Sequence, residues 1–384
     1  MARESEIIPA KAGILTEPQQ DPRFRGDFNH MQRALMLART HLGQTWPNPA
    51  VGAVVVKDDA IIGEGFTARG GRPHAEPQAL AKAGEAARGA TLYVSLEPCA
   101  HQGKTPPCTD AIIAAGISRV VIACGDPNPL VGGKGIAKLR ETGIEVVLGV
   151  CEQEARELNR GFISAVEQKC PYVMMKVATS ADEKIAYPPL PLGEGRGEGS
   201  PHPNLLPKGE GIKYITGEAA RTEVHRLRSE FDAILTGIGT VLADDPLLTV
   251  RAPGLEHKSP VRIVLDRSHR LPRGSNLSKT IDVSALWVLG SKTIPEALGT
   301  MAEKGITRVM VEAGQKLNTA MLESGMVDTL YWFKAPHTIG EDGLSVVEGS
   351  LKERLSGWTK VSETMFDRDM LEIYEKDGSQ SQLG

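Results

Sequence analysis

The sequence lacks the features that mark secreted, membrane-spanning and polyanion-binding proteins. Its 384 residues carry 44 basic and 48 acidic side chains, a formal net charge of -4, without a run of Lys or Arg. Such a charge pattern disfavours binding to nucleic acid. No stretch approaches 18 uninterrupted apolar residues, and the N-terminus has no secretory signal pattern. We therefore expect a cytoplasmic protein that binds neither nucleic acid nor membrane.

The cysteines are few, odd in number and mostly scattered along the chain. There are five of them, and only Cys99 and Cys108 lie close together, in a Pro-rich loop. Thiolates in that setting fit metal ligation better than a disulfide framework. The sequence therefore indicates a metal site around this loop.

The chain is longer than a single-core domain usually is, so we expect two domains. Residues 1–28 show neither helical nor strand periodicity and are expected to form a disordered extension. Strand-like and helix-like segments then alternate, beginning with a helix from Asn29 that Gly43 is placed to end. This alternation predicts a first α/β domain over 29–150.

A second alternating series follows a helical stretch, which we interpret as a linker helix over 151–170. The series starts with YVMMKVA at 172–178 and predicts a second α/β domain over 171–377. Within it, residues 187–211 are dense in Pro and Gly and predict an inserted surface loop. A loop of this size costs only roughly 1–2 kcal/mol more chain entropy than a short one, so a stable domain tolerates it.

One histidine and two cysteines are spaced as ligands of a catalytic zinc. His74 opens a predicted helix, 24 residues separate it from Cys99, and eight more separate Cys99 from Cys108. One imidazole and two thiolates leave the fourth tetrahedral position open for water, as a catalytic zinc requires. Zinc lowers the pKa of that water to about 7. Glu76, two residues after His74, is then placed to accept the proton and pass it to a departing amine.

A purely structural role for these residues is the alternative. His and Cys can be ordinary core residues, and a Cys pair can hold a closed structural zinc. No fourth ligand is evident, because His101 lies too close to Cys99 to be the clear choice. This alternative also leaves Glu76 without a role. The sequence therefore favours a zinc-dependent hydrolytic centre with Glu76 as its catalytic residue.

At these residues the chain resembles the cytidine-deaminase-like superfamily, whose signature joins H-x-E to P-C-x-x-C. The longer separation here, AHQGKTPP, departs from that pattern and matches the riboflavin-biosynthesis deaminases, as do PNPAVG at 47–52 and DPNP at 126–129. The resemblance implies that Asn48 hydrogen-bonds a pyrimidine. It also implies that Lys104 helps to hold a phosphoribosyl arm, for which a solvated lysine is the alternative.

The second domain resembles the reductase of the bifunctional riboflavin-biosynthesis family, which implies a dihydrofolate-reductase-like fold. The matching segments are VMMKVATSAD at 173–182, the long motif at 221–251 and VEAGQKLNTAMLESGMVD at 311–328. The resemblance implies cofactor contacts from Ala178, Tyr214, Thr240, Asp244, Gly314, Gln315, Lys316, Leu317, Asn318, Thr319 and Ala320. It implies substrate contacts from Arg228, Leu248, Arg251 and Glu312.

Physical reasoning supports part of this assignment. Gly314 lies where a strand passes into a helix, so that backbone N–H groups there are available to phosphates. Guanidinium groups suit a ribose phosphate, although surface ion pairs are the alternative for Arg228 and Arg251. Hydride transfer requires little beyond positioning of the nicotinamide against the sugar C1 carbon. The polar candidates at that position are Lys176, Asp244 and Glu312.

Three positions depart from the reductase pattern. Glu183 stands where Gly usually follows Asp182, Arg267 stands where a small polar residue is common, and Ile212 falls near an expected Ser. The inserted loop lies directly before Tyr214, beside the predicted cofactor contacts.

The sequence thus predicts a cytidine-deaminase-like α/β/α domain followed by a dihydrofolate-reductase-like α/β domain, with one zinc ion and NADPH as cofactors. The expected reactions are hydrolysis of the 2-amino group of 2,5-diamino-6-ribosylamino-4(3H)-pyrimidinone 5′-phosphate and reduction of its ribosyl chain to ribityl. One alternative is a deaminase whose reductase domain the insertion disables. Another is an enzyme that edits bases in nucleic acid. The resemblance also implies a homodimer or homotetramer.

Overall fold

The computed structural model describes residues 22–129, 131–186 and 214–377, which form two compact units. The first unit takes Val51–Thr67 and Pro73–Ala155 together with the helix before them. The second takes His41–Ala50, Ala68–Arg72 and the chain from Arg156. The predicted insertion 187–211 lies outside the described residues, as does the predicted extension up to residue 21.

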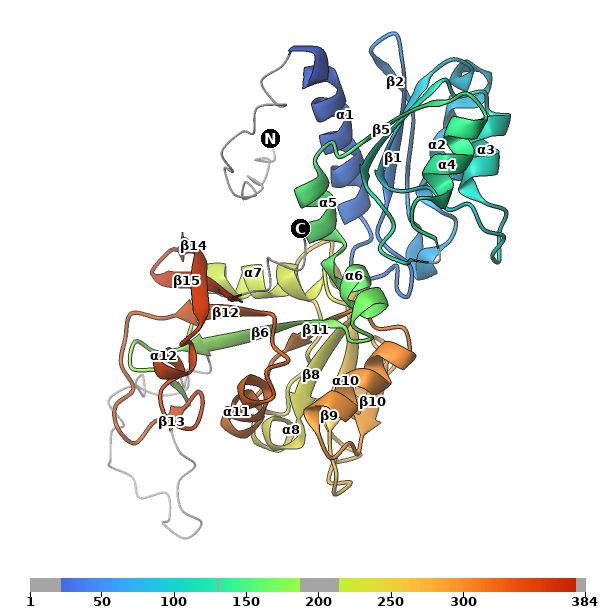
Figure 1. Ribbon diagram of the computed structural model, residues 1–384. Helices are drawn as coiled ribbons and strands as arrows, with labels where there is room; N and C mark the ends of the chain where they lie inside the picture. The colour runs from blue at the N-terminus through green and yellow to red at the C-terminus, as the bar shows by residue number, and fades with distance from the viewer. Residues whose placement is uncertain (1–21, 130, 187–213, 378–384) are drawn as a thin grey trace. The chain divides into compact units, whose positions relative to one another are not determined.

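The first unit is built on a five-stranded sheet in the order β2-β1-β3-β4-β5. Strand β1 pairs antiparallel with β2 and β3, whereas β3, β4 and β5 run parallel. Helix α1 covers one face of the sheet, and α2, α3 and α4 cover the other (Figure 1). The strands are β1 (Gly52–Lys57), β2 (Ala60–Phe66), β3 (Thr91–Leu96), β4 (Arg119–Cys124) and β5 (Glu145–Leu148). The helices are α1 (Pro22–Arg39), α2 (Ala75–Ala83), α3 (Cys108–Ala114) and α4 (Lys134–Glu141).

Helix α1 begins at Pro22, earlier than the start at Asn29 that the sequence predicts. Proline suits the first position of a helix because its missing N–H would have no partner there. Farther along, the Asp27 carboxylate accepts hydrogen bonds from the Tyr93 hydroxyl at 2.7 Å and from Arg119 at 2.7 and 2.8 Å. These bonds attach the early turns of α1 to the sheet, so residues 22–28 are helical rather than part of an extension.

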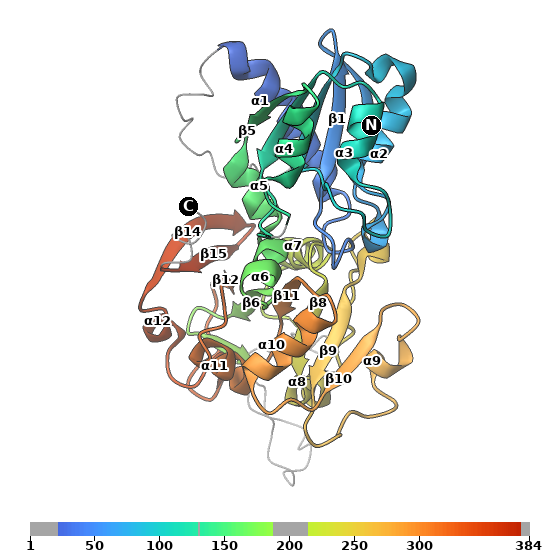
Figure 2. The same ribbon diagram turned by 45° about the vertical axis from the view of Figure 1, so that its right-hand side comes forward.

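The second unit contains an eight-stranded sheet in the order β10-β9-β8-β11-β6-β12-β15-β14. The strands from β10 to β12 are parallel, and β15 and β14 continue antiparallel from β12 (Figure 2). These strands are β6 (Tyr172–Thr179), β8 (Ala233–Gly237), β9 (Val261–Leu265), β10 (Leu286–Leu289), β11 (Arg308–Val311), β12 (Thr329–Lys334), β14 (Trp358–Phe366) and β15 (Asp369–Lys376). Strands β7 (Lys184–Ala186) and β13 (Leu344–Ser345) form a separate pair. The helices are α7 (Glu218–Arg228), α8 (Ile238–Asp244), α9 (Asn276–Lys279), α10 (Ile294–Glu303), α11 (Gln315–Glu323) and α12 (Leu351–Arg354).

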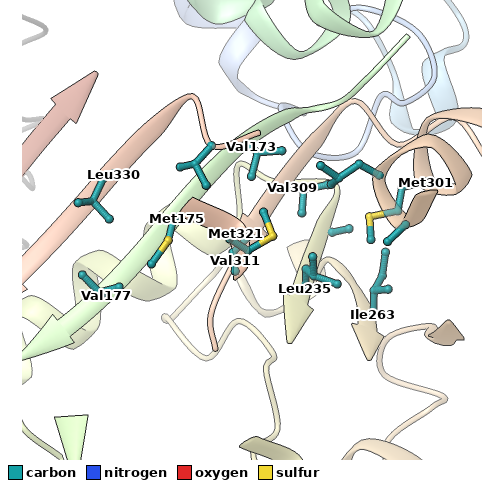
Figure 3. Close-up of a cluster of buried hydrophobic side chains, with 14 of the residues drawn as sticks. Val173, Met175, Val177, Leu235, Ile263, Met301, Val309, Val311, Met321 and Leu330 are labelled. Carbon is teal, nitrogen blue, oxygen red and sulfur yellow. The ribbon is translucent and has the colours of Figure 1, made fainter. Parts of the chain in front are cut away.

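Apolar side chains fill both faces of this sheet, as a parallel sheet covered by helices requires. Strand β6 shows the alternation, because Val173 and Met175 point into one core whereas Tyr172 and Met174 point into the other. The first core includes side chains from α10 and α11 (Figure 3). The second core includes side chains from α7 and α8. The near-continuous apolar run in β6 follows from this burial on both faces.

The predicted linker helix is two helices, α5 (Glu152–Leu158) and α6 (Arg160–Glu167). They are separated at Asn159, whose side chain accepts from Ala50 N–H at 3.0 Å and donates to Ala50 O at 3.1 Å. This pairing fixes the junction of the two helices to the peptide group of Ala50. Gly161 then brings α6 close to β11, because a Cβ there would lie 2.3 Å from Arg308 Cγ.

Candidate active sites

The three predicted zinc ligands come from three segments of the first unit and meet at one point. His74 immediately precedes α2, Cys99 follows β3, and Cys108 is the first residue of α3. Their donor atoms all lie within 4.8 Å of one another. None of the five cysteines, all of which lie among the described residues, forms a disulfide, so the sulfurs of Cys99 and Cys108 are available as ligands.

The separations between the donor atoms fit tetrahedral zinc. His74 Nδ1 lies 3.3 Å from Cys108 Sγ and 3.9 Å from Cys99 Sγ. Ligand atoms bonded to a tetrahedral zinc lie about 3.6–3.8 Å from one another. Two thiolates and one imidazole are also donors that zinc prefers, and they leave one coordination position open.

Hydrogen bonds prepare Cys99 to bind a cation. The backbone N–H of Cys108 donates to Cys99 Sγ at 3.3 Å, and the Cys99 carbonyl accepts from the Thr109 N–H at 3.2 Å. Hydrogen bonding by Cys108 and His74 lowers the pKa of the Cys99 thiol, although burial opposes this shift. The thiolate is the form of cysteine that ligates metals.

Glu76 lies in the first turn of α2, beside these ligands, with 4% of its surface exposed. Burial raises the pKa of its carboxyl, and the nearby charge of Cys99 adds to the rise. A carboxyl beside the reacting groups can act as a general acid and base. The position and the environment of Glu76 therefore suit a proton carrier.

Two further deaminase contacts are predicted: Asn48, which precedes the first ligand in the chain, and Lys104, which lies between the second and the third. Asn48 belongs to the second unit, where its amide donates to the Gly71 carbonyl at 3.1 Å. Gly71 has a φ of +82°, and a Cβ there would lie 1.9 Å from Asn48 Nδ2, so glycine is required. Lys104 and His101 are exposed on the loop that joins Cys99 to Cys108. Substrate contacts of Asn48 and Lys104 stay predictions.

Three of the predicted substrate contacts meet in the second unit. Lys176 lies on β6, Glu312 directly follows the neighbouring strand β11, and Arg228 ends α7. Arg228 Nε and Nη2 donate to the two oxygens of Glu312 at 2.6 and 3.0 Å. Lys176 Nζ lies 3.6 Å from Glu312 Oε2. The cluster thus joins two cations to one anion.

The charges of this cluster are strongly coupled because all three side chains are largely buried. Burial alone would raise the pKa of Glu312, but Arg228 and Lys176 lower it to about 2. Burial lowers the pKa of Lys176, and the charge of Glu312 opposes that shift. Glu312 is therefore ionised, and the remaining positive charge favours an anionic ligand.

Beside this cluster lies His225, a residue that sequence analysis did not single out. The Arg251 backbone N–H donates to His225 Nδ1 at 3.3 Å. Burial and the charges of Arg228 and Arg251 lower the pKa of His225 to about 4, so its ring is neutral at pH 7. Leu248 is buried nearby in the chain with a φ of +51°, a strained backbone for a branched side chain. His225 is a single histidine within a helical pattern, and nothing in the sequence indicates that it lies beside the Arg228 cluster.

Cofactor contacts are predicted where the parallel strands β8 and β11 end and α8 and α11 begin. Gly314 precedes α11, but its own N–H donates to Thr240 Oγ1 on α8 at 3.0 Å, so this N–H is not available to a phosphate as the sequence predicts. Asn318 Oδ1 on α11 is buried without a hydrogen-bond partner in the described part of the chain. Helix N-termini at the carboxyl edge of a parallel sheet attract phosphate groups. These observations fit a dinucleotide cofactor at this edge.

The remaining cofactor predictions divide by position. Ala178 lies on β6, Asp244 ends α8, and Tyr214 is half-exposed with the Arg221 guanidinium 4.6 Å from its ring. The side chains of Asn318 and Thr319 bond to the protein itself, so a cofactor contact at these two residues would involve backbone or the free Asn318 oxygen. The others on α11 are Gln315, Lys316, Leu317 and Ala320.

Glu183, which departs from the family pattern, has a φ of +61°, where glycine is favoured. Its carboxylate accepts a hydrogen bond from the Leu351 N–H at 2.8 Å, at the start of α12. The side chain therefore provides a contact that glycine lacks. Arg267 bonds to the Ser291 carbonyl at 3.2 Å on the surface, and Ile212 lies outside the described residues.

Two substitutions at Glu183 separate these effects. E183A keeps the strained backbone and loses the bond to Leu351, whereas E183G loses the bond but relieves the strain. We therefore expect E183G to be more stable than E183A by about 1 kcal/mol, the approximate cost of a left-handed backbone at a residue with a Cβ. Urea unfolding of both variants measures the difference in their free energies of unfolding. An E183G variant less stable than E183A would contradict the interpretation that the backbone at residue 183 is strained.

Two protein families match the chain. Residues 25–124 match the family described as the cytidine and deoxycytidylate deaminase zinc-binding region. Residues 171–370 match the family described as the RibD C-terminal domain. The first range contains His74, Cys99 and Cys108, and the second contains the Lys176 cluster. Each site therefore lies within a matched family region.

Several known proteins match most of the chain. The riboflavin biosynthesis protein RibD of Aquifex aeolicus is 42% identical over 355 residues, which are 85% of this chain and 94% of that protein. The Acinetobacter baumannii RibD structure has a TM-score of 0.79 at 36% identity and covers 92% of this chain and 99% of its own. A Thermotoga maritima structure has a TM-score of 0.78 at 35% identity with the same coverage. It is described as a diaminohydroxyphosphoribosylaminopyrimidine deaminase/5-amino-6-(5-phosphoribosylamino)uracil reductase.

Proposed function

This chain belongs to the RibD family of riboflavin biosynthesis proteins, and on that premise we propose which residues carry its two reactions. It is a bifunctional enzyme with a zinc-binding deaminase domain and an NADPH-using reductase domain. The predicted cytidine-deaminase-like and dihydrofolate-reductase-like folds are confirmed. The first reaction removes the 2-amino group of 2,5-diamino-6-ribosylamino-4(3H)-pyrimidinone 5′-phosphate. The second reduces the ribosyl chain and yields 5-amino-6-(5-phosphoribitylamino)uracil.

The deaminase domain, proposed over 29–150, uses His74, Cys99 and Cys108 to hold one zinc ion. Bound zinc makes hydroxide available near pH 7. Glu76, which lies beside the ligands in the first turn of α2, would carry the proton from the bound water to the departing amine. The proposed substrate contacts of this domain are Asn48, on the pyrimidine, and Lys104, on the phosphoribosyl arm.

The reductase domain is proposed over 171–377, after a linker at 151–170. When bound, NADPH would provide the hydride for reduction of the sugar at its C1 carbon. We propose that Lys176 donates the proton that the reduced substrate then needs, because burial lowers the pKa of its ammonium group. Glu312 orients Lys176 and Arg228 through the bonds described above. The ribose phosphate is bound by Arg228 and Arg251.

The observation that carries the deaminase assignment is the convergence of His74, Cys99 and Cys108 beside the buried Glu76. Zinc removal tests it. Chelated protein is expected to release no ammonia from the diamino substrate, and added Zn²⁺ is expected to restore release. NADPH oxidation with the deaminated substrate should persist throughout, because the reductase residues lie in the other unit. Ammonia release that survives complete zinc removal would contradict the assignment.

The chain on both sides of the inserted loop is anchored, which favours an active reductase over a disabled one. Before the loop, β7 pairs with β13. After it, the Gly217 N–H donates to the buried Asp369 carboxylate at 2.6 Å, and Arg221 donates to the Thr216 carbonyl at 2.6 Å. The segments on both sides of the insertion therefore keep their contacts with the rest of the reductase unit.

Replacement of residues 187–211 by a short Gly-Ser linker tests this interpretation. We expect the rate of NADPH oxidation to stay close to that of the full chain, because shortening a surface loop changes the free energy of unfolding by only about 1–2 kcal/mol. Steady-state NADPH oxidation with the deaminated substrate measures it. A large increase in rate would support the alternative in which the insertion disables the reductase.

We also propose that the enzyme acts in the cytoplasm as a homodimer or homotetramer on small-molecule substrates, without nucleic-acid or membrane partners. Among the described residues, no helix is both long and apolar enough to cross a bilayer. Light scattering on the purified chain gives its mass and tests the oligomer. A gel shift with single-stranded RNA and fractionation of cells test the absence of the other partners.

A further inference from the structure

Glu97 is a buried carboxylate to which the two reactions assign no role. It directly follows β3 and lies two residues before a zinc ligand, with 4% of its surface exposed. Its Oε1 accepts from the backbone N–H groups of Gly135 at 2.9 Å and Ile136 at 3.2 Å. Its Oε2 accepts from those of Asp126 at 3.2 Å and Gly133 at 3.0 Å. The Glu97 side chain thus accepts four hydrogen bonds from backbone N–H groups between residues 126 and 136.

Two of these donors belong to the first turn of α4, which begins at Lys134. Backbone N–H groups at that position have no partner within the helix, and the helix dipole favours a negative charge there. Gly135 also allows a close approach, because a Cβ would lie 2.1 Å from the Pro98 carbonyl oxygen. The turn that leads from Glu97 to Cys99 is therefore packed directly against the start of α4.

The start of α3 forms hydrogen bonds to the same segment, residues 97–99, through Cys99 itself. The Cys99 carbonyl accepts from the Thr109 N–H at 3.2 Å and from its hydroxyl at 3.3 Å. The Cys108 N–H donates to Cys99 Sγ. Two helix N-termini thus fix the position of one zinc ligand, and Glu97 makes the connection to α4.

We propose that Glu97 is a positioning residue of the zinc centre, whose carboxylate fixes the Cys99 turn against α4 and thereby sets zinc affinity and ligand geometry. An ionised carboxylate accepts at both oxygens, whereas a glutamine amide accepts at only one. E97Q therefore leaves two of the four backbone donors facing an NH₂ group. This inference rests on the proposed assignment of zinc to His74, Cys99 and Cys108.

The experiment measures the metal centre in the full-length chain without relying on activity. Zinc affinity is obtained by competition with a chromophoric chelator, and the visible spectrum of the Co²⁺-substituted protein reports ligand geometry. Loss of a residue that orients a metal ligand typically lowers affinity about 10- to 100-fold, which is the result expected for E97Q. We also expect its cobalt absorption bands to shift or weaken relative to wild type.

Two further variants separate positioning from general destabilisation. G135A keeps the carboxylate but introduces a methyl group against the Pro98 carbonyl, so it should lower zinc affinity and alter the cobalt spectrum in the same direction. D27N is the matched control, because Asp27 is an equally buried carboxylate of the same unit that bonds to Tyr93 and Arg119. Its zinc affinity and cobalt spectrum should equal those of wild type.

The outcomes distinguish this inference from the zinc assignment. Wild-type zinc affinity and an unchanged cobalt spectrum in both E97Q and G135A would overturn the role of Glu97. An equal loss in D27N would overturn it as well, because the effect would then be general destabilisation. A wild-type chain that fails to bind zinc would contradict the zinc assignment itself.

Discussion

Replacing Glu76 with Gln is expected to slow ammonia release by about 10²- to 10⁴-fold, the usual contribution of a positioned general acid–base group. Glutamine is close in size to glutamate and should occupy the same buried position beside the ligands. Its amide cannot take up and return a proton in the working pH range. Because Glu76 is not a proposed ligand, E76Q should still hold one zinc ion per chain. Ammonia release and zinc content are measured on the same preparation.

Glu85 provides the matched control for this prediction. It lies soon after α2 in the same unit and is exposed, so E85Q removes a carboxylate that is remote from any assigned chemistry. E85Q should release ammonia at the wild-type rate. NADPH oxidation with the deaminated substrate should be unchanged in both variants. The role of Glu76 would be wrong if E76Q retained full deaminase activity, or if its activity fell only in proportion to lost zinc.

The largest effect on the reductase is expected from R228K. This variant should lower kcat/KM for the deaminated substrate roughly 30- to 1000-fold. That change corresponds to a loss of about 2–4 kcal/mol of charge-assisted hydrogen bonding. The Arg228 guanidinium donates to both oxygens of Glu312 and, through Nη1, to the Thr249 carbonyl at 3.0 Å. Lysine keeps the charge but lacks this planar fork. Initial rates of NADPH oxidation over a range of substrate concentrations give the change.

Arg226 is the control for Arg228 because it lies on the same helix and pairs with Glu223 and Glu230. Its side chain is 44% exposed, so these pairs contribute little. We expect R226K to keep kcat/KM within about a factor of five of wild type, which corresponds to the usual upper limit for an exposed ion pair. Equal effects of R226K and R228K would contradict the assigned role of Arg228. Ammonia release should be normal in both.

The zinc centre could be predicted from sequence because its chemistry depends on residue types that have few other reasons to occur together. His74, Cys99 and Cys108 provide that signal, and Glu76 completes it. Glu97 gives no comparable sequence signal. Its carboxylate accepts hydrogen bonds from four backbone N–H groups, and this role is visible only in the structure, where α4 lies beside it. A side chain that hydrogen-bonds to a segment distant in the sequence can be recognised only from the tertiary structure. The local sequence pattern carries no information about such a contact.

Strand β2 shows why local sequence patterns do not predict every strand of the fold. Its segment contains Gly63 and Gly65, which are unfavourable in strands by local preference. The structure gives the reason for both, because a Cβ at either position would lie 2.1–2.2 Å from a carbonyl oxygen of α2. Tertiary packing therefore overrides local propensity here. The interior parallel strands were predictable because burial on both faces makes them continuous apolar runs.

The most direct measurement follows ammonia and NADPH together in one reaction that contains purified full-length protein, zinc, NADPH and the diamino substrate. We predict that ammonia appears first and that NADPH is then consumed mole for mole as the ribityl product forms. Ammonia release without NADPH oxidation, even when the deaminated substrate is supplied directly, would contradict the conclusion that this one chain carries both activities.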